Sequence, residues 1–204
     1  MLTQNKFVIK EHGKLLSSRK TYDILDAETG GPLAKAEQKT GLLASLIGMV
    51  LGPPATTIEI RSVDGGKLLF AVRRRGMLVK KVEAIDESGK VVGLYKTKRF
   101  SLSGGFHVYD GAGKHVTEIR GKLLKADYKF LSPDGKSELG SVSKKWGGMA
   151  KELLTSADTY VVQISPETAE IPGARIRILG AAIAIDALMG GKGGSSGGGD
   201  SGEE

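Results

Sequence analysis

The stretch Ala174–Met189, which reads ARIRILGAAIAIDALM, decides how this chain folds. The two charges within it, Arg177 and Asp186, lie nine positions apart. On a helix of 3.6 residues per turn they are separated by roughly 900° and face opposite sides, so no polar face exists. A helix that is apolar on every side is buried, and this one is shorter than the ~20 residues that span a bilayer. We therefore expect it to fill the interior of a barrel formed by the same chain, with Arg177 and Asp186 at the two mouths.

A repeated turn separates β-rich runs along the rest of the chain. In each copy an Asp that bonds its own backbone comes before a Gly that supplies a positive φ. The flanking runs, such as TTIEIRSV and KLLFAVRR, are typical of strands. A continuous series of hairpins closes into a barrel or sandwich, because closure protects its edges. The copies are 63–67 (VDGGK), 86–90 (DESGK), 110–114 (DGAGK), 133–136 (PDGK) and the looser 26–30 (DAETG).

Length and composition predict one domain with a tail. The 204 residues suffice for one sizeable core, and we place it over residues 1–189, with the helix at about 174–189. Residues 190–204, GGKGGSSGGGDSGEE, have no apolar side chain to bury and predict a disordered Gly/Ser-rich acidic tail. The absence of cysteine excludes disulfides and thiolate nucleophiles. The N-terminus lacks the apolar run of a signal peptide, so the cytoplasm is the default compartment.

The charge balance favours an anionic partner. Thirty Lys and Arg against 23 Asp and Glu give a formal net charge of +7. Such a balance suits a phospholipid surface, a nucleic acid or an acidic protein, and the plain alternative is a solvated surface without a special partner. Each well-placed cation contributes ~1 kcal/mol to attachment to anionic lipid. The basic clusters that we expect to bind headgroups are Arg73, Arg74, Arg75, Lys80, Lys81, Lys96, Lys98 and Arg99.

A second apolar segment, Thr40–Leu51, reads TGLLASLIGMVL and stops at Gly52-Pro53-Pro54. It predicts a short helix or an apolar loop. If it projects from the barrel, it inserts into the membrane interface; the alternative is that it packs on the barrel. The residues that would insert are Leu43, Leu46, Ile47 and Val50.

No set of residues predicts catalysis. The three histidines, His12, His107 and His115, lie near different turns without the spacing of metal ligands, so we expect them to be surface groups. No serine or aspartate occupies a nucleophile motif. We therefore expect no enzyme, no cofactor and no metal site.

The C-terminal third resembles a known family. Gly140–Tyr160, GSVSKKWGGMAKELLTSADTY, resembles the phospholipid scramblase stretch with G-x-(I/V)-x-K-x-W followed by T-D-A-D-N-F. Ala181–Leu188 is similar to the terminal helix of that family, and YDILD (22–26) and LAKAE (33–37) match its first hairpin. The chain thus resembles the scramblase and LURP-one-related proteins of the tubby C-terminal-like superfamily. The resemblance implies a mostly β fold, a closed antiparallel barrel of about twelve strands around a buried hydrophobic C-terminal helix.

The resemblance also shapes the expected function. Ser156 replaces the first acidic residue of the family's proposed calcium loop and only Asp158 remains, whereas calcium takes six to eight oxygen ligands. A degenerate loop without metal is therefore expected. We expect binding of anionic phospholipid headgroups at the cytoplasmic membrane surface. Lipid scrambling, which the resemblance also implies, is disfavoured but left open, because a helix that fills the barrel cannot cross a bilayer. A protein–protein interaction scaffold without lipid binding is the alternative. Nucleic-acid binding is weaker, because aromatic residues make up only 5% of the chain and no stacking motif interleaves the basic runs.

Overall fold

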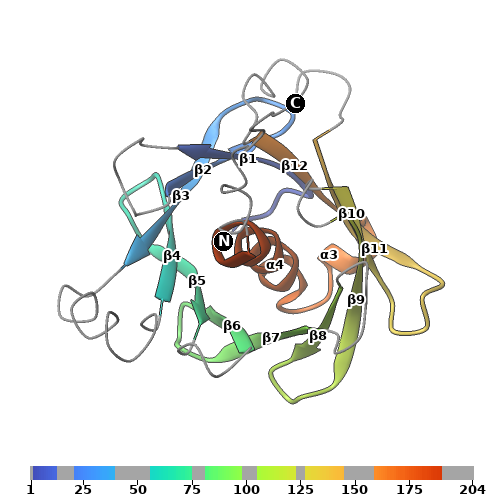
Figure 1. The fold of residues 1–204 in the computed structure, drawn as a ribbon. Helices are drawn as coiled ribbons and strands as arrows, with labels where there is room; N and C mark the ends of the chain where they lie inside the picture. The colour runs from blue at the N-terminus through green and yellow to red at the C-terminus, as the bar shows by residue number, and fades with distance from the viewer. Residues whose placement is uncertain are drawn as a thin grey trace, which may run out of the picture.

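Twelve strands form one closed antiparallel barrel in which each strand pairs with its neighbours in sequence and β12 returns to pair with β1 (Figure 1). The fold is that of a computed structural model, which describes residues 2–12, 21–39, 56–74, 81–97, 105–122, 127–144 and 159–189. The predicted fold class is thereby confirmed. The strands are β1 (Lys6–His12), β2 (Thr21–Asp26), β3 (Pro32–Lys39), β4 (Thr56–Ser62), β5 (Leu68–Arg74), β6 (Lys81–Asp86), β7 (Val91–Thr97), β8 (Phe106–Asp110), β9 (His115–Lys122), β10 (Asp127–Leu131), β11 (Glu138–Ser143) and β12 (Thr159–Ile164).

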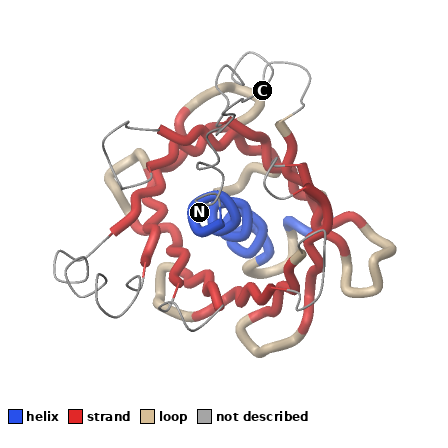
Figure 2. The backbone as a smooth tube through the Cα atoms, in the orientation of Figure 1, coloured by secondary structure: helices blue, strands red, loops and turns tan. Residues whose placement is uncertain are grey.

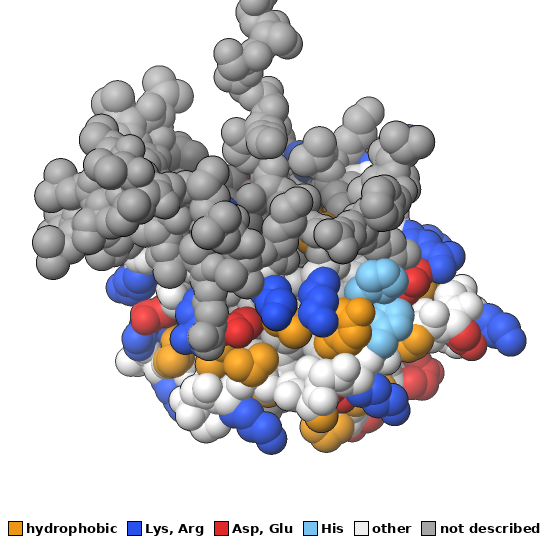
Figure 3. Space-filling view, turned by 60° about the horizontal axis from the view of Figure 1, so that its bottom comes forward, with side chains coloured by type: hydrophobic (Ala, Val, Ile, Leu, Met, Phe, Trp, Pro, Cys, Tyr) orange, Lys and Arg blue, Asp and Glu red, His pale blue; other side chains and the backbone are white. Residues whose placement is uncertain are grey.

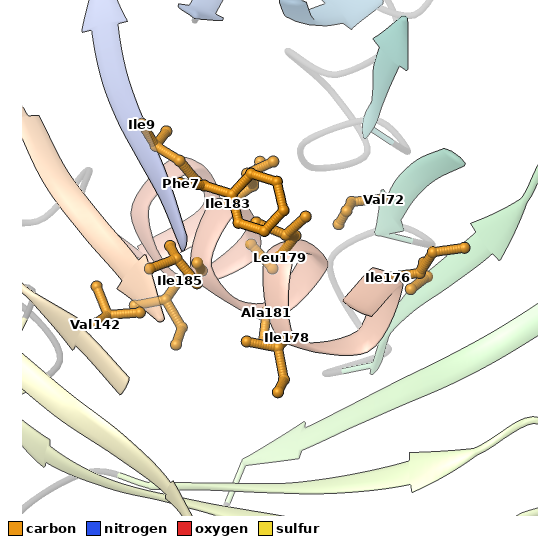
Figure 4. Packing of buried hydrophobic residues seen from close by; sticks show 14 of the residues in the cluster. Phe7, Ile9, Val72, Val142, Ile176, Ile178, Leu179, Ala181, Ile183 and Ile185 are labelled. Carbon is orange, nitrogen blue, oxygen red and sulfur yellow. The ribbon is translucent and has the colours of Figure 1, made fainter. Parts of the chain in front are cut away.

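A helix occupies the centre of this barrel. Helix α4 (Ala174–Met189) follows the short α3 (Pro166–Ala169) and lies inside the ring of strands (Figure 2). Its isoleucines point from all sides toward the barrel wall (Figure 4), and Leu179 and Ile183 are 1% and 0% exposed. The predicted central helix is confirmed with the expected bounds. Among the described residues, none of the helices has the length and apolar character needed to cross a membrane.

The five predicted turns all lie at one end of the barrel, which we call the turn end. They join β2 to β3, β4 to β5, β6 to β7, β8 to β9 and β10 to β11. The predicted chemistry is present: Asp26, Asp86 and Asp110 each accept hydrogen bonds from backbone N–H groups of their own turns. Glycines at positive φ complete these turns, as Gly89 does at φ 86°.

Each of these five hairpins also has a β-bulge next to its turn. The register skips one residue of the second strand, and that residue is a large aliphatic one packed against the core. A bulge reverses the in–out alternation of a strand, so these side chains turn inward and close the turn end. The bulged residues are Leu33, Leu69, Val92, Val116 and Leu139.

Helix α4 approaches β5, β6 and β7 closely at Gly180. The hydroxyl of Tyr95 on β7 donates a 2.8 Å hydrogen bond to the carbonyl of Arg177. A Cβ at Gly180 would lie 2.7 Å from this hydroxyl oxygen, closer than side chains pack. The contact therefore requires glycine, although glycine in a helix interior costs about 1 kcal/mol relative to alanine.

We expect Gly180→Ala to lower the free energy of unfolding by about 1–3 kcal/mol, because overpacking outweighs the gain in helix propensity. Urea denaturation measures the effect. Tyr95→Phe removes the obstructing oxygen, so Gly180→Ala should cost less in that background than in the wild type. Additive effects of the two substitutions would show that the Tyr95 hydroxyl is not what excludes the Cβ.

The turn aspartates predict a specific dependence of stability on pH. A hydrogen bond from the Ser88 hydroxyl (2.6 Å), aided by the backbone N–H groups of Ser88 and Lys90, holds the pKa of Asp86 below its ordinary value of 3.8. A lowered pKa stabilises the fold above pH 3.8, and this contribution is lost as the pH falls through the folded-state value. Asp86→Ala should therefore cost roughly 1 kcal/mol at pH 6 and progressively less below pH 3.8.

Chemical denaturation from pH 6 to pH 2.5 would check this expectation. Asp64→Ala is the matched control, because the Asp64 carboxylate, also in a turn, makes no hydrogen bond to the described part of the chain. A deficit in Asp86→Ala that stays constant across this range would contradict the assignment.

Candidate functional site

The sequences of the connections between the strands differ in charge. The five turns at the turn end balance, with Lys67, Lys90, Lys114 and Lys136 against Glu28, Asp64, Glu87 and Asp134. The connection from β12 to α4 also lies at this end and adds Glu167 and Glu170. The other six connections between strands join strand ends at the opposite end, which we call the loop end. Apart from Gly105 and Lys144, the residues of these connections lie outside the described ones, but their sequence is strongly basic. They contain Lys14, Arg19, Lys20, Arg75, Lys80, Lys98, Arg99, Lys125, Lys144, Lys145 and Lys151, against Glu152 and Asp158.

Two lysines of the described structure stand opposite each other near the loop end. Lys81 on β6 and Lys96 on β7 are cross-strand partners on the outer face of the barrel. Like charges in this arrangement are destabilising. The Lys96 ammonium lies 4.2 Å from the centre of the Tyr109 ring, a cation–π contact that fixes its position. Within the described ranges Lys81 has no ion-pair partner, so the two ammonium groups form an uncompensated positive site.

The arginines of β5 have different roles. Arg73 faces outward and donates two hydrogen bonds to Glu83 on β6, of 2.8 and 3.1 Å, so its charge is neutralised within the fold. Arg74 has the opposite orientation, as alternation along a strand predicts. Its Nε is buried, and no hydrogen-bond partner for it exists among the residues that the structure describes.

Figure 3 shows Lys and Arg side chains beside hydrophobic side chains and the pale-blue histidines on one face of the barrel. The structure thus brings Arg73, Lys81 and Lys96 together on adjacent strands of the outer face. The remaining predicted site residues lie outside the described residues. They are Arg75, Lys80, Lys98, Arg99, Leu43, Leu46, Ile47, Val50, Ser156 and Asp158.

A cavity of about 610 Å³ at the turn end contains Arg177, the residue expected at a mouth. Arg177 Nη1 donates to the carbonyls of Val92 and Pro172, each at 3.3 Å. Burial lowers the pKa of Arg177, while the nearby Tyr95 and Asp110 oppose this shift. The carboxylates of Asp86 and Asp110, which also line the cavity, are bonded to their own turns. These polar groups stabilise the turn end, so we do not take this cavity as the functional site.

The prediction that His107 and His115 lie apart is wrong. His107 Nδ1 and His115 Nε2 are 3.2 Å apart, and Glu118 Oε1 lies 3.7 Å from His107 Nδ1. In a regular strand, odd-numbered His115 and even-numbered Glu118 would face opposite sides. The bulge at Val116 removes this difference and places both on the outer face. The repeated turn pattern is the sequence signal that marks the bulge, with a Leu or Val three residues after the turn glycine in four turns and four residues after it in the fifth.

The described residues form a helix-filled antiparallel barrel with Lys81 and Lys96 opposed on its outer face. Residues 67–189 match the model of the Scramblase family, and the chain belongs to that family. The X-ray structure of the Arabidopsis thaliana protein AT5G01750, a LURP-one-related protein, is similar over 90% of this chain and 89% of that chain, with a TM-score of 0.52 and 10% identity. At this identity the similarity shows a shared fold alone. No curated protein sequence matches the chain.

We expect Arg73→Met to destabilise the protein by about 1–2 kcal/mol, because it leaves the Glu83 carboxylate half-buried without its guanidinium. Thermal or urea denaturation measures this. Arg73→Met combined with Glu83→Leu should recover much of the loss, since no charge is then left behind. An Arg73→Met variant as stable as the wild type would mean that the ion pair is not structural and that Arg73 is available for a ligand.

Proposed function

We propose that this Scramblase-family protein is a non-enzymatic module that binds anionic phospholipid headgroups at the cytoplasmic membrane surface through its loop end. The opposed ammonium groups of Lys81 and Lys96 carry the proposal. A pair of like charges on neighbouring strands weakens the isolated fold, and an anion that contacts both removes the penalty.

The charge distribution supports attachment by this end. At ~1 kcal/mol for each cation near an anionic surface, four or five cations suffice for reversible binding. The described strands and the sequences of the loop-end connections exceed this number, whereas the turn end has no net excess in its connections. Such attachment weakens with salt, because exposed charges are screened over ~8 Å at physiological ionic strength.

Apolar residues accompany the cations in the loop-end sequences. Leu43, Leu46, Ile47 and Val50 belong to the connection between β3 and β4, while the five turns contain no Leu, Ile, Met, Phe or Trp. The turn end has Ile171, 50% exposed, in the connection from β12 to α4. Apolar side chains next to a basic patch form a two-part membrane anchor. This arrangement favours a lipid surface over a nucleic acid, for which stacking aromatic residues would be expected.

The test is sedimentation of the protein with vesicles of phosphatidylcholine alone and with added phosphatidylserine. We expect pelleting only with the anionic vesicles and less of it as salt is raised. The double variant Lys81→Gln/Lys96→Gln loses two cations that each contribute ~1 kcal/mol to vesicle binding, and it should bind roughly 30-fold more weakly. Lys114→Gln with Lys136→Gln removes the same charge from the turn end and should have little effect.

The outcomes separate the candidate functions. Equal weakening by the two double variants would indicate attraction by net charge without a defined face. Failure to pellet under any condition would contradict lipid binding and favour a protein partner. Salt-sensitive binding to an oligonucleotide that persists without lipid and is lost in the Lys81/Lys96 variant would favour nucleic acid.

A further inference from the structure

We propose that His107, His115 and Glu118 form a binding site for a divalent transition-metal ion of the zinc type on the outer face of the β8–β9 hairpin. The proposal does not rest on lipid binding. It rests on the positions of three donor groups, whose ligand atoms all lie within 4.8 Å of one another.

The hairpin geometry brings the donors together. His107 and Glu118 are direct cross-strand partners, and the bulge at Val116 moves His115 onto the same face, where it pairs with Tyr109. The His107 and His115 rings are 4.9 Å apart and nearly perpendicular, and the Tyr109 ring packs 5.4 Å from His115. These contacts between rigid side chains orient the two imidazoles before any ion binds.

The distances match a tetrahedral ion. Bonds of 2.0–2.1 Å to nitrogen or oxygen place two ligand atoms about 3.3 Å apart. The separation of 3.2 Å between His107 Nδ1 and His115 Nε2 is already at this value, and that of 3.7 Å from His107 Nδ1 to Glu118 Oε1 needs only a small rotation. Three protein ligands leave the fourth position of the ion for solvent or an outside ligand.

The hydrogen bonds at His115 compete with an ion and are exchanged when it binds. His115 Nε2 lies 3.1 Å from the carbonyl oxygen of Thr117 as well as 3.2 Å from His107 Nδ1. In one tautomer, a single proton on His115 Nε2 is shared between these two acceptors. An ion takes the place of that proton when His115 carries its hydrogen on Nδ1 instead.

Arg120 is the positioning residue of this site. It donates two hydrogen bonds to Glu118 Oε2, of 2.5 and 2.8 Å, and the Glu118 side chain is only 10% exposed. The other oxygen, Oε1, is the one nearer to His107. Hydrogen bonds of this kind fix the orientation of a ligating carboxylate.

The donor atoms determine which ions fit, because the surrounding positive charge opposes every cation. Lys96 is the cross-strand partner of His107, and the Arg120 guanidinium contacts Glu118, so the site is positively charged on two sides. A hard cation such as calcium needs six to eight oxygen ligands, several of them carboxylates, whereas this site offers a single carboxylate. Two imidazoles and one carboxylate suit zinc, cobalt, nickel or copper.

Isothermal titration of the purified full chain with Zn²⁺, in the absence of lipid, tests the site. We expect one ion per chain, and Co²⁺ should give the visible absorption of a low-coordinate site with nitrogen ligands. His107→Ala and His115→Ala should each weaken binding by more than roughly 100-fold, since even loss of an orienting group outside the ligand shell costs 10–100-fold. His12→Ala is the matched control, because His12 on β1 contacts Asp23 on β2 and is not among the three donors.

Absence of Zn²⁺ binding to the wild type would overturn the proposal. Binding that survives in both His107→Ala and His115→Ala, or that is lost in His12→Ala, would overturn it as well. Circular dichroism and thermal unfolding of each variant without metal show whether the fold is retained. If His115→Ala fails to fold, His115→Gln keeps the polar side chain and serves in its place.

Discussion

Burial of helix α4 is the interaction on which the rest of the structure depends. A closed barrel of about eight strands is just filled by its own side chains, so twelve strands enclose a wider interior that needs another occupant. Leu179 and Ile183 supply part of that filling, and each buried side chain of this size contributes about 1.5–3 kcal/mol. Gly180 lets the helix lie close to β5–β7, and the Tyr95 hydroxyl fixes its position along the barrel.

Because helix α4 is part of the core, we do not expect it to leave the barrel when the protein functions. Leaving the barrel would expose apolar surface on both the helix and the lumen, so we place the function on the outer surface and the ends. The turn end is closed by its bulged aliphatic residues and by Arg177, whose donors are bonded to backbone carbonyls. The sequences of the loop-end connections have an excess of cations, and the described structure leaves Lys81 and Lys96 uncompensated among its own residues.

Features determined by local chemistry were predictable from the sequence, and features determined by register were not. Short stretches of sequence determine the turns, through their Asp and Gly residues, and the helix over 174–189, through its lack of a polar face. The structure confirms the turns and the helix. Alternation along β5 accounts for the opposite orientations of Arg73 and Arg74. The ion pair between Arg73 and Glu83 depends on how β5 aligns with β6, which one strand alone does not specify. The contact between His107 and His115 depends on a bulge that reverses the alternation.

Hydrogen–deuterium exchange, with and without phosphatidylserine vesicles, tests the central claim. This claim is that helix α4 stays inside the barrel while the outer surface of the protein binds lipid. Amides of residues 176–185 should be among the slowest to exchange and should remain equally protected when vesicles are added, because exchange there requires global unfolding. Increased protection should instead appear near Lys81 and Lys96. A vesicle-dependent loss of protection in the helix would mean that α4 leaves the barrel at the membrane, and would contradict this account of the fold and of its function.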